Sequence, residues 1–109
     1  MLPATDLLPR CPVRTTLELL GGKWRLLLIA QLAETPLRPV ELRRRVPEIS
    51  ETVLNRELRF LEQNHLIGRE TAATGPRRTV YSLTERGRAA LPLLEAMAGF
   101  ARAYREGAD

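Results

Sequence analysis

The side chains best suited to binding chemistry lie between residues 50 and 63. Polar groups recur there at a spacing that gathers them on one side of an α-helix: Thr52, Asn55, Arg56, Arg59 and Gln63. On the other side, Leu54, Leu58 and Leu61 follow the i, i+4, i+7 spacing of a core-facing stripe. The forked groups of Arg and Asn match guanine and adenine edges, and a Thr hydroxyl reaches a base or a phosphate. The pattern predicts a helix that enters the major groove of duplex DNA; a helix whose polar face meets only water is the alternative.

A second basic group is the pair Arg77 and Arg78, which we expect at the tip of a hairpin. Residues 67–73 and 79–83 contain the Thr, Val and Tyr typical of strands, and Gly75 and Pro76 between them favour a turn. Two arginines at such a tip suit a phosphate or minor-groove contact. A solvated loop with incidental arginines is the alternative.

Little else in the sequence could support catalysis. The chain has one cysteine, Cys11, and one histidine, His65, so an internal disulfide is excluded and a cysteine-based metal site would need other ligands. We find no Ser/His/Asp set, glycine-rich phosphate loop or paired ligand spacing, and we expect no enzyme activity, no cofactor and no bound metal. For His65 we expect a favourable interaction with the dipole at a helix end, with metal binding or proton sensing as the alternative.

The polar helix must be positioned by the elements around it. A short helix should end near Val46, because Pro47 disfavours helical geometry at the residue before it. After a turn, Ser50 can cap the next helix and Glu51 suits the positive end of its dipole. Two helices joined by such a turn, followed by two strands, predict a mainly α fold with a small β-wing, the winged helix-turn-helix.

The rest of the chain should form a scaffold. We expect a helix at 12–20 that is ended by Gly21 and Gly22. An apolar helix should follow at 23–33, with Trp24 as a buried anchor. Apolar residues such as Leu27 and Leu28 should leave few of its positions exposed to water. Pro36 and Pro39 should confine the chain between them to an extended link that forms at most a short strand of the wing.

One long helix is expected at 85–105, capped by Thr84 and bent at Pro92. It is apolar over so much of its surface that we expect it to meet a second copy in a two-fold dimer. The expected interface residues are Leu91, Leu94, Met97, Ala98, Phe100, Ala101 and Tyr104. Two recognition helices about 34–36 Å apart would then read two half-sites of a pseudo-palindromic operator.

The distribution of charge agrees with this organisation. Residues 38–88 hold eleven Arg and Lys against seven Asp and Glu, which accounts for the whole net charge of +4. We expect a single domain over 1–109, with a flexible arm at 1–10, N-terminal helices in 11–33, a DNA-binding unit at 37–83 and a dimerisation helix at 84–105. No apolar run approaches the roughly 18 residues that span a bilayer, so we expect no membrane contact and a cytoplasmic location.

Several motifs in order resemble the HxlR-type winged-helix transcriptional regulators, which are related to the MarR group. The matching segments are Cys11-Pro12-Val13, Gly21-Gly22-Lys23-Trp24, Glu41-Leu42-Arg43-Arg44, Pro47-Glu48-Ile49-Ser50, Leu58-Arg59-Phe60-Leu61-Glu62 and residues 81–87. The chain departs from the family pattern at Pro39, which weakens the first wing strand, at Glu48, and at His65, where a glycine often ends the recognition helix.

The resemblance implies a dimeric DNA-binding regulator, often a repressor. The expected DNA contacts are Arg38, Arg43, Ser50, Glu51, Thr52, Asn55, Arg56, Arg59, Arg77 and Arg78. Cys11 matches a cysteine through which some family members respond to electrophiles or oxidants, and a helix N-terminus beside Arg10 and Arg14 should favour its thiolate. The alternatives are a small buried Cys11 and a small effector bound near Trp24 and Phe100.

Two other kinds of function stay open. Winged helices also serve as protein-interaction modules that do not touch DNA. An RNA-binding role is less well supported, because Tyr81 alone cannot form an aromatic platform for unpaired bases.

Overall fold

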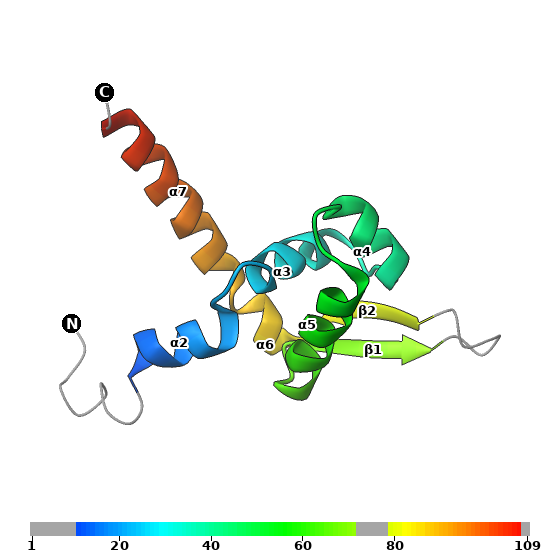
Figure 1. Cartoon of the computed structure of the whole chain (residues 1–109). Coiled ribbons are helices and arrows are strands. Elements are labelled where there is room, and N and C mark those ends of the chain that lie inside the picture. The colour runs from blue at the N-terminus through cyan, green and yellow to red at the C-terminus, as the bar shows by residue number, and fades with distance from the viewer. Residues whose placement is uncertain (1–10, 72–78, 108–109) are drawn as a thin grey trace.

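The computed structural model describes residues 11–71 and 79–107, and it has the winged-helix architecture (Figure 1). The elements in chain order are α2 (Pro12–Leu20), α3 (Arg25–Glu34), α4 (Pro39–Arg45), α5 (Glu51–Gln63), β1 (Ile67–Thr71), β2 (Thr79–Leu83), α6 (Glu85–Arg88) and α7 (Leu91–Gly107). The fold class predicted from the sequence is confirmed. The proposed arm at 1–10 and the predicted hairpin tip, with Arg77 and Arg78, lie outside the described residues.

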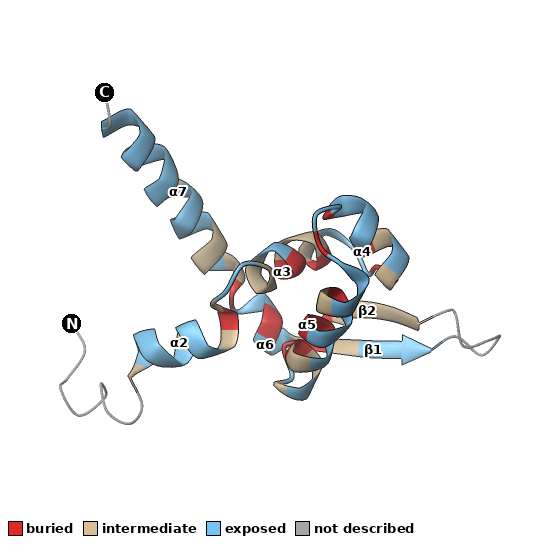
Figure 2. Cartoon of the chain, viewed as in Figure 1, coloured by how far each residue is buried: buried red, intermediate tan, exposed pale blue. Residues whose placement is uncertain are grey.

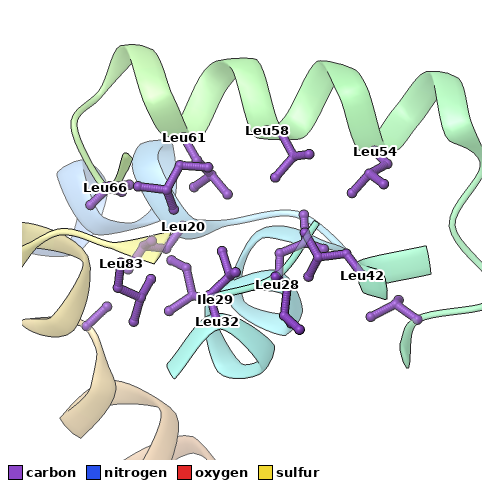
Figure 3. Close-up of a cluster of buried hydrophobic side chains, with 14 of the residues drawn as sticks. Leu20, Leu28, Ile29, Leu32, Leu42, Leu54, Leu58, Leu61, Leu66 and Leu83 are labelled. Atoms are coloured by element: carbon purple, nitrogen blue, oxygen red, sulfur yellow. The ribbon is translucent and has the colours of Figure 1, made fainter. Parts of the chain in front are cut away.

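The hydrophobic core lies among α3, α4, α5 and the start of the sheet. Its fully buried side chains include Leu28, Ile29 and Leu32 of α3, Leu42 of α4, and Leu54, Leu58 and Leu61 of α5 (Figure 3). Each buried leucine contributes about 1.5–3 kcal/mol relative to an exposed one. The core leucines of α5 face those of α3 (Figure 3). This packing of the apolar stripe fixes the rotation of α5 about its own axis.

The helix-turn-helix forms as the sequence predicts. Helix α4 ends at Arg45 with Val46 as its C-cap, and residues 47–49 turn the chain. Ser50 then caps α5, its Oγ accepting a hydrogen bond from the Val53 amide at 3.1 Å.

The wing is a two-stranded antiparallel sheet in which Ile67 pairs with Leu83 and Thr71 with Thr79. Leu37 adds an isolated bridge to Tyr81, with N–O distances of 3.0 and 2.8 Å. The extended link at 37–38 therefore supplies one pair of hydrogen bonds, and no longer strand, because Pro39 starts α4 two residues later.

Helix α3 differs from the prediction at its start and on one face. It begins at Arg25 and not at Lys23, because Gly22 turns the chain with a φ of +94° and Trp24 becomes the N-cap. Trp24 packs against the core but is only partly buried, and Lys23 Nζ lies 4.7 Å from the centre of its ring. Leu27 is 47% exposed, so the expectation that this helix leaves few positions for water is wrong there.

The prediction of one helix over 85–105 is wrong. Thr84 caps α6 as expected, its Oγ1 accepting from the Gly87 amide at 3.1 Å, but α6 ends at Arg88. Pro92 has no amide hydrogen and its ring would collide with the carbonyl of Arg88 in a continuous helix. The chain therefore turns at Ala89 and Ala90 and starts α7 at Leu91, with Pro92 in the first turn where proline is tolerated.

Candidate nucleic-acid interface

Helix α5 separates its two faces as its sequence pattern predicts. Its leucine stripe is buried, whereas five polar positions on the other side are exposed in this chain (Figure 2): Thr52, Asn55, Arg56, Arg59 and Gln63. Ser50 and Glu51, before and within the first turn, are exposed too. An uncovered row of forked donors and acceptors on a rigid helix is the geometry that major-groove reading requires.

The C-terminal end of α5 is held by a Schellman motif. The Leu66 amide donates to the Leu61 carbonyl at 2.9 Å and the His65 amide to the Glu62 carbonyl at 3.0 Å. His65 occupies the left-handed region with a φ of +61°, at the position where a glycine is usual. The end of the helix is therefore fixed even though His65 is a costly residue for it.

A hollow of about 650 Å³ lies between α4, the start of α5 and the wing. Its lining includes four of the residues predicted to contact DNA: Arg38, Arg43, Glu51 and Asn55. The structure thus places side chains from the link before α4, from α4 and from α5 around one concave surface.

Sequence reasoning missed two residues of this surface, Arg69 and Tyr81. They face each other across the sheet, and both line the first hollow and a neighbouring one of about 480 Å³ with Asn55 and Arg59. Arg69 Nε lies 3.3 Å from Glu62 Oε2, which ties the wing to α5. The signal that could have found Arg69 is the antiparallel register, which sets it opposite Tyr81.

The arginines predicted to contact DNA differ in how freely they can reach a phosphate. Arg38 Nε lies 3.4 Å from Glu41 Oε1, and Arg56 Nε lies 3.5 Å from Glu57 Oε2. Within residues 11–71 and 79–107, Arg43 and Arg59 make no ion pair. These two guanidinium groups can therefore meet a phosphate without first leaving a carboxylate.

Glu41 stabilises the start of α4. The Arg38 amide donates to Glu41 Oε1 at 2.8 Å, and this backbone hydrogen bond, helped by the Arg38 charge, holds the pKa of the Glu41 carboxyl below its ordinary value. Arg38 and Pro39 are thereby fixed at the rim of the hollow.

Cys11 is the N-cap of α2, with its Sγ 3.5 Å from the Arg14 amide nitrogen that donates to it. In the single chain its side chain is neither buried nor fully exposed, so the sensor role and the alternative of a small buried cysteine both stay predictions. The thiol lies at the helix N-terminus where the sequence placed it.

Most of the large apolar side chains that are exposed in the described residues lie on α2 and α7, and the others are Leu27 of α3 and Val40 of α4. Val13 and Leu17 are 59% and 63% exposed, and Met97, Phe100 and Tyr104 are 47%, 73% and 69% exposed. Of the other residues predicted for a dimer interface, Ala98 and Ala101 are exposed, whereas Leu91 and Leu94 pack partly against the chain's own core. The rings of Phe100 and Tyr104 stack with centroids 6.3 Å apart.

An apolar groove of about 530 Å³ runs between α2, the start of α3 and α7. Leu17 and Leu26 line it on one side and Leu93 and Met97 on the other. This is the region where the sequence suggested a small effector, but neither Trp24 nor Phe100 lines the groove.

Among the helices that the structure describes, none combines the length and apolarity required to cross a bilayer. Over the same residues, His, Cys, Asp and Glu side chains form no cluster of three suited to a metal ion.

Comparison with known proteins agrees with the geometry. Residues 19–109 match the family model described as HxlR-like helix-turn-helix. An HTH-type transcriptional regulator of Methanothermobacter thermautotrophicus is 38% identical over 94 residues, which are 86% of this chain and 72% of the relative. The HTH-type transcriptional regulator YodB of Bacillus subtilis is 33% identical over 91% of this chain and 89% of its own length.

Solved structures give the same result. The redox regulator HypR in its reduced form superimposes with a TM-score of 0.81 at 35% identity, covering 86% of this chain and 93% of HypR. The reduced form of YodB superimposes with a TM-score of 0.80 at 29% identity over the whole of both chains. A quinone-bound form of YodB is also similar, with a TM-score of 0.73 at 30% identity over 84% of this chain and 96% of YodB.

Proposed function

This chain belongs to the HxlR-like helix-turn-helix family of transcriptional regulators, and we propose that it acts as a homodimer that binds a pseudo-palindromic DNA operator and represses transcription there. The observation that carries the proposal is the open polar face of α5 beside the hollow that Arg38, Arg43 and Arg69 border. A helix entering the major groove would bring base edges to Asn55 and Arg59, with the phosphates flanking it near α4 and the wing.

In this proposal, Arg77 and Arg78 add phosphate or minor-groove contacts from the wing tip. They carry positive charge next to strands whose described parts already lie beside α5. Ser50, Glu51 and Thr52 would serve the N-terminal end of the reading helix, where amides point toward a phosphate.

The dimer would form through the apolar residues of α2 and α7. Their exposed side chains form a surface too apolar to be left in water in a small domain, and a second copy would cover it symmetrically. Two α5 helices would then read half-sites one helical turn apart, about 34–36 Å.

We further propose that DNA release follows modification of Cys11. HypR is called a redox regulator and YodB has a quinone-bound form, and Cys11 caps the helix that we place in the dimer contact. Alkylation, a sulfenic acid or a disulfide with the partner's cysteine would each change the start of α2. An effector in the groove between α2 and α7 is the competing trigger, favoured by that groove's apolar lining.

A gel shift with the protein's own upstream region, repeated at several salt concentrations, tests DNA binding. We expect log Kd to rise with log salt, because phosphate contacts release counterions. Asn55→Ala should weaken binding to the preferred site by about 1–3 kcal/mol and relax the sequence preference of the protein, and Arg56→Ala should do the same.

The matched comparison is a wing variant. Arg77→Ala or Arg78→Ala should weaken binding to all DNA sequences alike and reduce the salt slope by about one unit per lost contact. Unchanged function after Arg56 and Arg59 are both neutralised would favour the alternative, a winged-helix module that binds protein and not DNA.

A further inference from the structure

Glu57 stands out on α5 because it is a charge in the apolar stripe. It is 7% exposed and is the buried charged residue of the described chain, lying between Leu54 and Leu61 on the core side of the helix. A carboxylate without a partner there would cost several kcal/mol. A leucine would fill the position without that cost, so a buried carboxylate here requires a positive group beside it.

The nearest such group is Arg25, the first residue of α3, whereas the mostly exposed Arg56 lies with its Nε 3.5 Å from the other carboxylate oxygen. Arg25 Nε donates to Glu57 Oε1 at 2.8 Å, and the guanidinium carbon lies 3.5 Å from the centre of the Phe60 ring, one turn further along α5. A positive charge in the first turn of a helix opposes the helix dipole, so the fit to α5 and not the stability of α3 explains this arginine.

The same guanidinium also holds α2. Arg25 Nη1 donates to the Glu18 carbonyl at 2.8 Å, in the last turn of α2. Leu20, at the C-terminal end, is the buried residue of α2, and the N-terminal part of this helix projects from the rest of the molecule (Figure 1). The end of α2 and the buried side of α5 therefore both contact one rigid, planar group, the Arg25 guanidinium.

We propose that Arg25 is a positioning residue that couples the orientation of α2 to that of the DNA-reading helix α5 through Glu57 and Phe60. A tilt of α2 about Gly21 and Gly22 moves the Glu18 carbonyl, and Arg25 transmits the movement because its other contacts are on α5. That the coupled helix reads DNA rests on the proposed function; the coupling itself does not.

Amide hydrogen exchange in the free protein tests the coupling. Glu57→Gln keeps the shape of the side chain but removes its charge, and we expect about tenfold faster exchange in α5 and also in residues 17–20 of α2. Arg25→Lys, which keeps the charge but loses the fork, should affect the same two segments. Leu32→Val in the core of α3 serves as the control, with faster exchange spread over the whole fold. Acceleration confined to the mutated helix in both variants would overturn the proposal.

DNA binding tests the positioning role. Since the Arg25 side chain is 20% exposed and bonded to protein, Arg25→Lys should lower affinity for the preferred site about tenfold while affinity for unrelated duplex and the salt slope stay unchanged. A residue with only a structural role would leave the ratio of specific to non-specific affinity of the folded protein at its wild-type value, and a direct phosphate contact would lower the affinity for both duplexes alike. Either result overturns the positioning role. If the wild-type protein itself shows no preference between the two duplexes, the proposed function fails, whereas the exchange experiment still decides the coupling.

Discussion

Cys11 can be tested without disturbing the helix that it caps. Its Sγ accepts from the Arg14 amide, and a serine hydroxyl is a stronger acceptor in the same place. We expect Cys11→Ser to bind DNA like the wild type but to resist release by diamide or quinones. Gel shifts before and after treatment measure this.

Cys11→Ala is the matched control, because it removes both the thiol and the cap. If it resists release as Cys11→Ser does, loss of the thiol and not the change of cap explains the resistance. Release that persists in Cys11→Ser would eliminate the thiol trigger and favour an effector in the groove between α2 and α7.

His65 holds a left-handed conformation that costs an L-residue about 1 kcal/mol. We expect His65→Gly to raise the free energy of unfolding by about 0.5–1 kcal/mol, a net gain after the greater flexibility of glycine in the unfolded chain. Urea titration measures it. His65→Ala removes the ring but keeps Cβ, so an equal gain in that variant would show that the backbone conformation is not the cause.

At the scale of single residues, the sequence predicted which side chains are exposed better than which side chains contact each other. Thr52, Asn55 and Arg59 could be assigned to an open face because that face follows from helical period alone. Arg25 and Glu57 could not be paired, since they are 32 positions apart and the period of a helix shows on which side a charge lies but not which residue it meets. Arg69 needed the register of the sheet before its place beside α5 could be known.

At the scale of elements, α6 must pack closely on the chain that precedes the sheet. A Cβ on Gly87 would press on the Leu66 carbonyl oxygen far inside van der Waals distance, and the 3.2 Å to a Leu83 methyl leaves no direction for escape. We expect Gly87→Ala to destabilise the fold by about 2–4 kcal/mol in thermal or urea unfolding.

Gly99→Ala is the matched control within α7. A Cβ there would meet Arg102 Nη2 at an ordinary 3.9 Å, so helix propensity should dominate and the variant should gain about 0.5–1 kcal/mol. Equal effects of the two variants would mean that α6 can move away from Leu66.

The boundaries of α2, α5 and β2 and the end of α4 could be predicted because capping residues and prolines mark them locally. The break between α6 and α7 was missed for a different reason. Pro92 by itself predicts a bend in a continuous helix, but the close contact at Gly87 and the hydrogen bond that Thr84 Oγ1 donates to the His65 carbonyl already fix α6 beside the sheet. With α6 fixed, the chain meets the proline by ending one helix and starting another.

At the scale of the whole molecule, α2 and α7 are exposed along most of their length (Figure 2), and they carry most of the large apolar side chains that are exposed in the described residues. The sequence could indicate this apolar surface, because α7 carries more apolar residues than one small core can bury. It could not indicate which of them serve the chain's own core. The structure assigns Leu91, Leu93 and Leu94 partly to that core and leaves Phe100 and Tyr104 uncovered.

Phe100 is therefore the residue at which the dimer can be tested without unfolding the protomer. At 73% exposure its ring contributes little to the fold of the protomer. At equal subunit concentration, Phe100→Glu should therefore lower the free energy of unfolding only by the amount that dimerisation contributes in the wild type. Sedimentation should show a monomer, and affinity for a two-half-site operator should fall by about a hundredfold, since the second half-site no longer gains from the first. Arg102→Glu reverses a charge on the opposite side of α7, two residues away, and should keep both the dimer and the affinity. A Phe100→Glu variant that stays dimeric would remove α7 from the interface and leave the stacked pair of Phe100 and Tyr104 to some other partner.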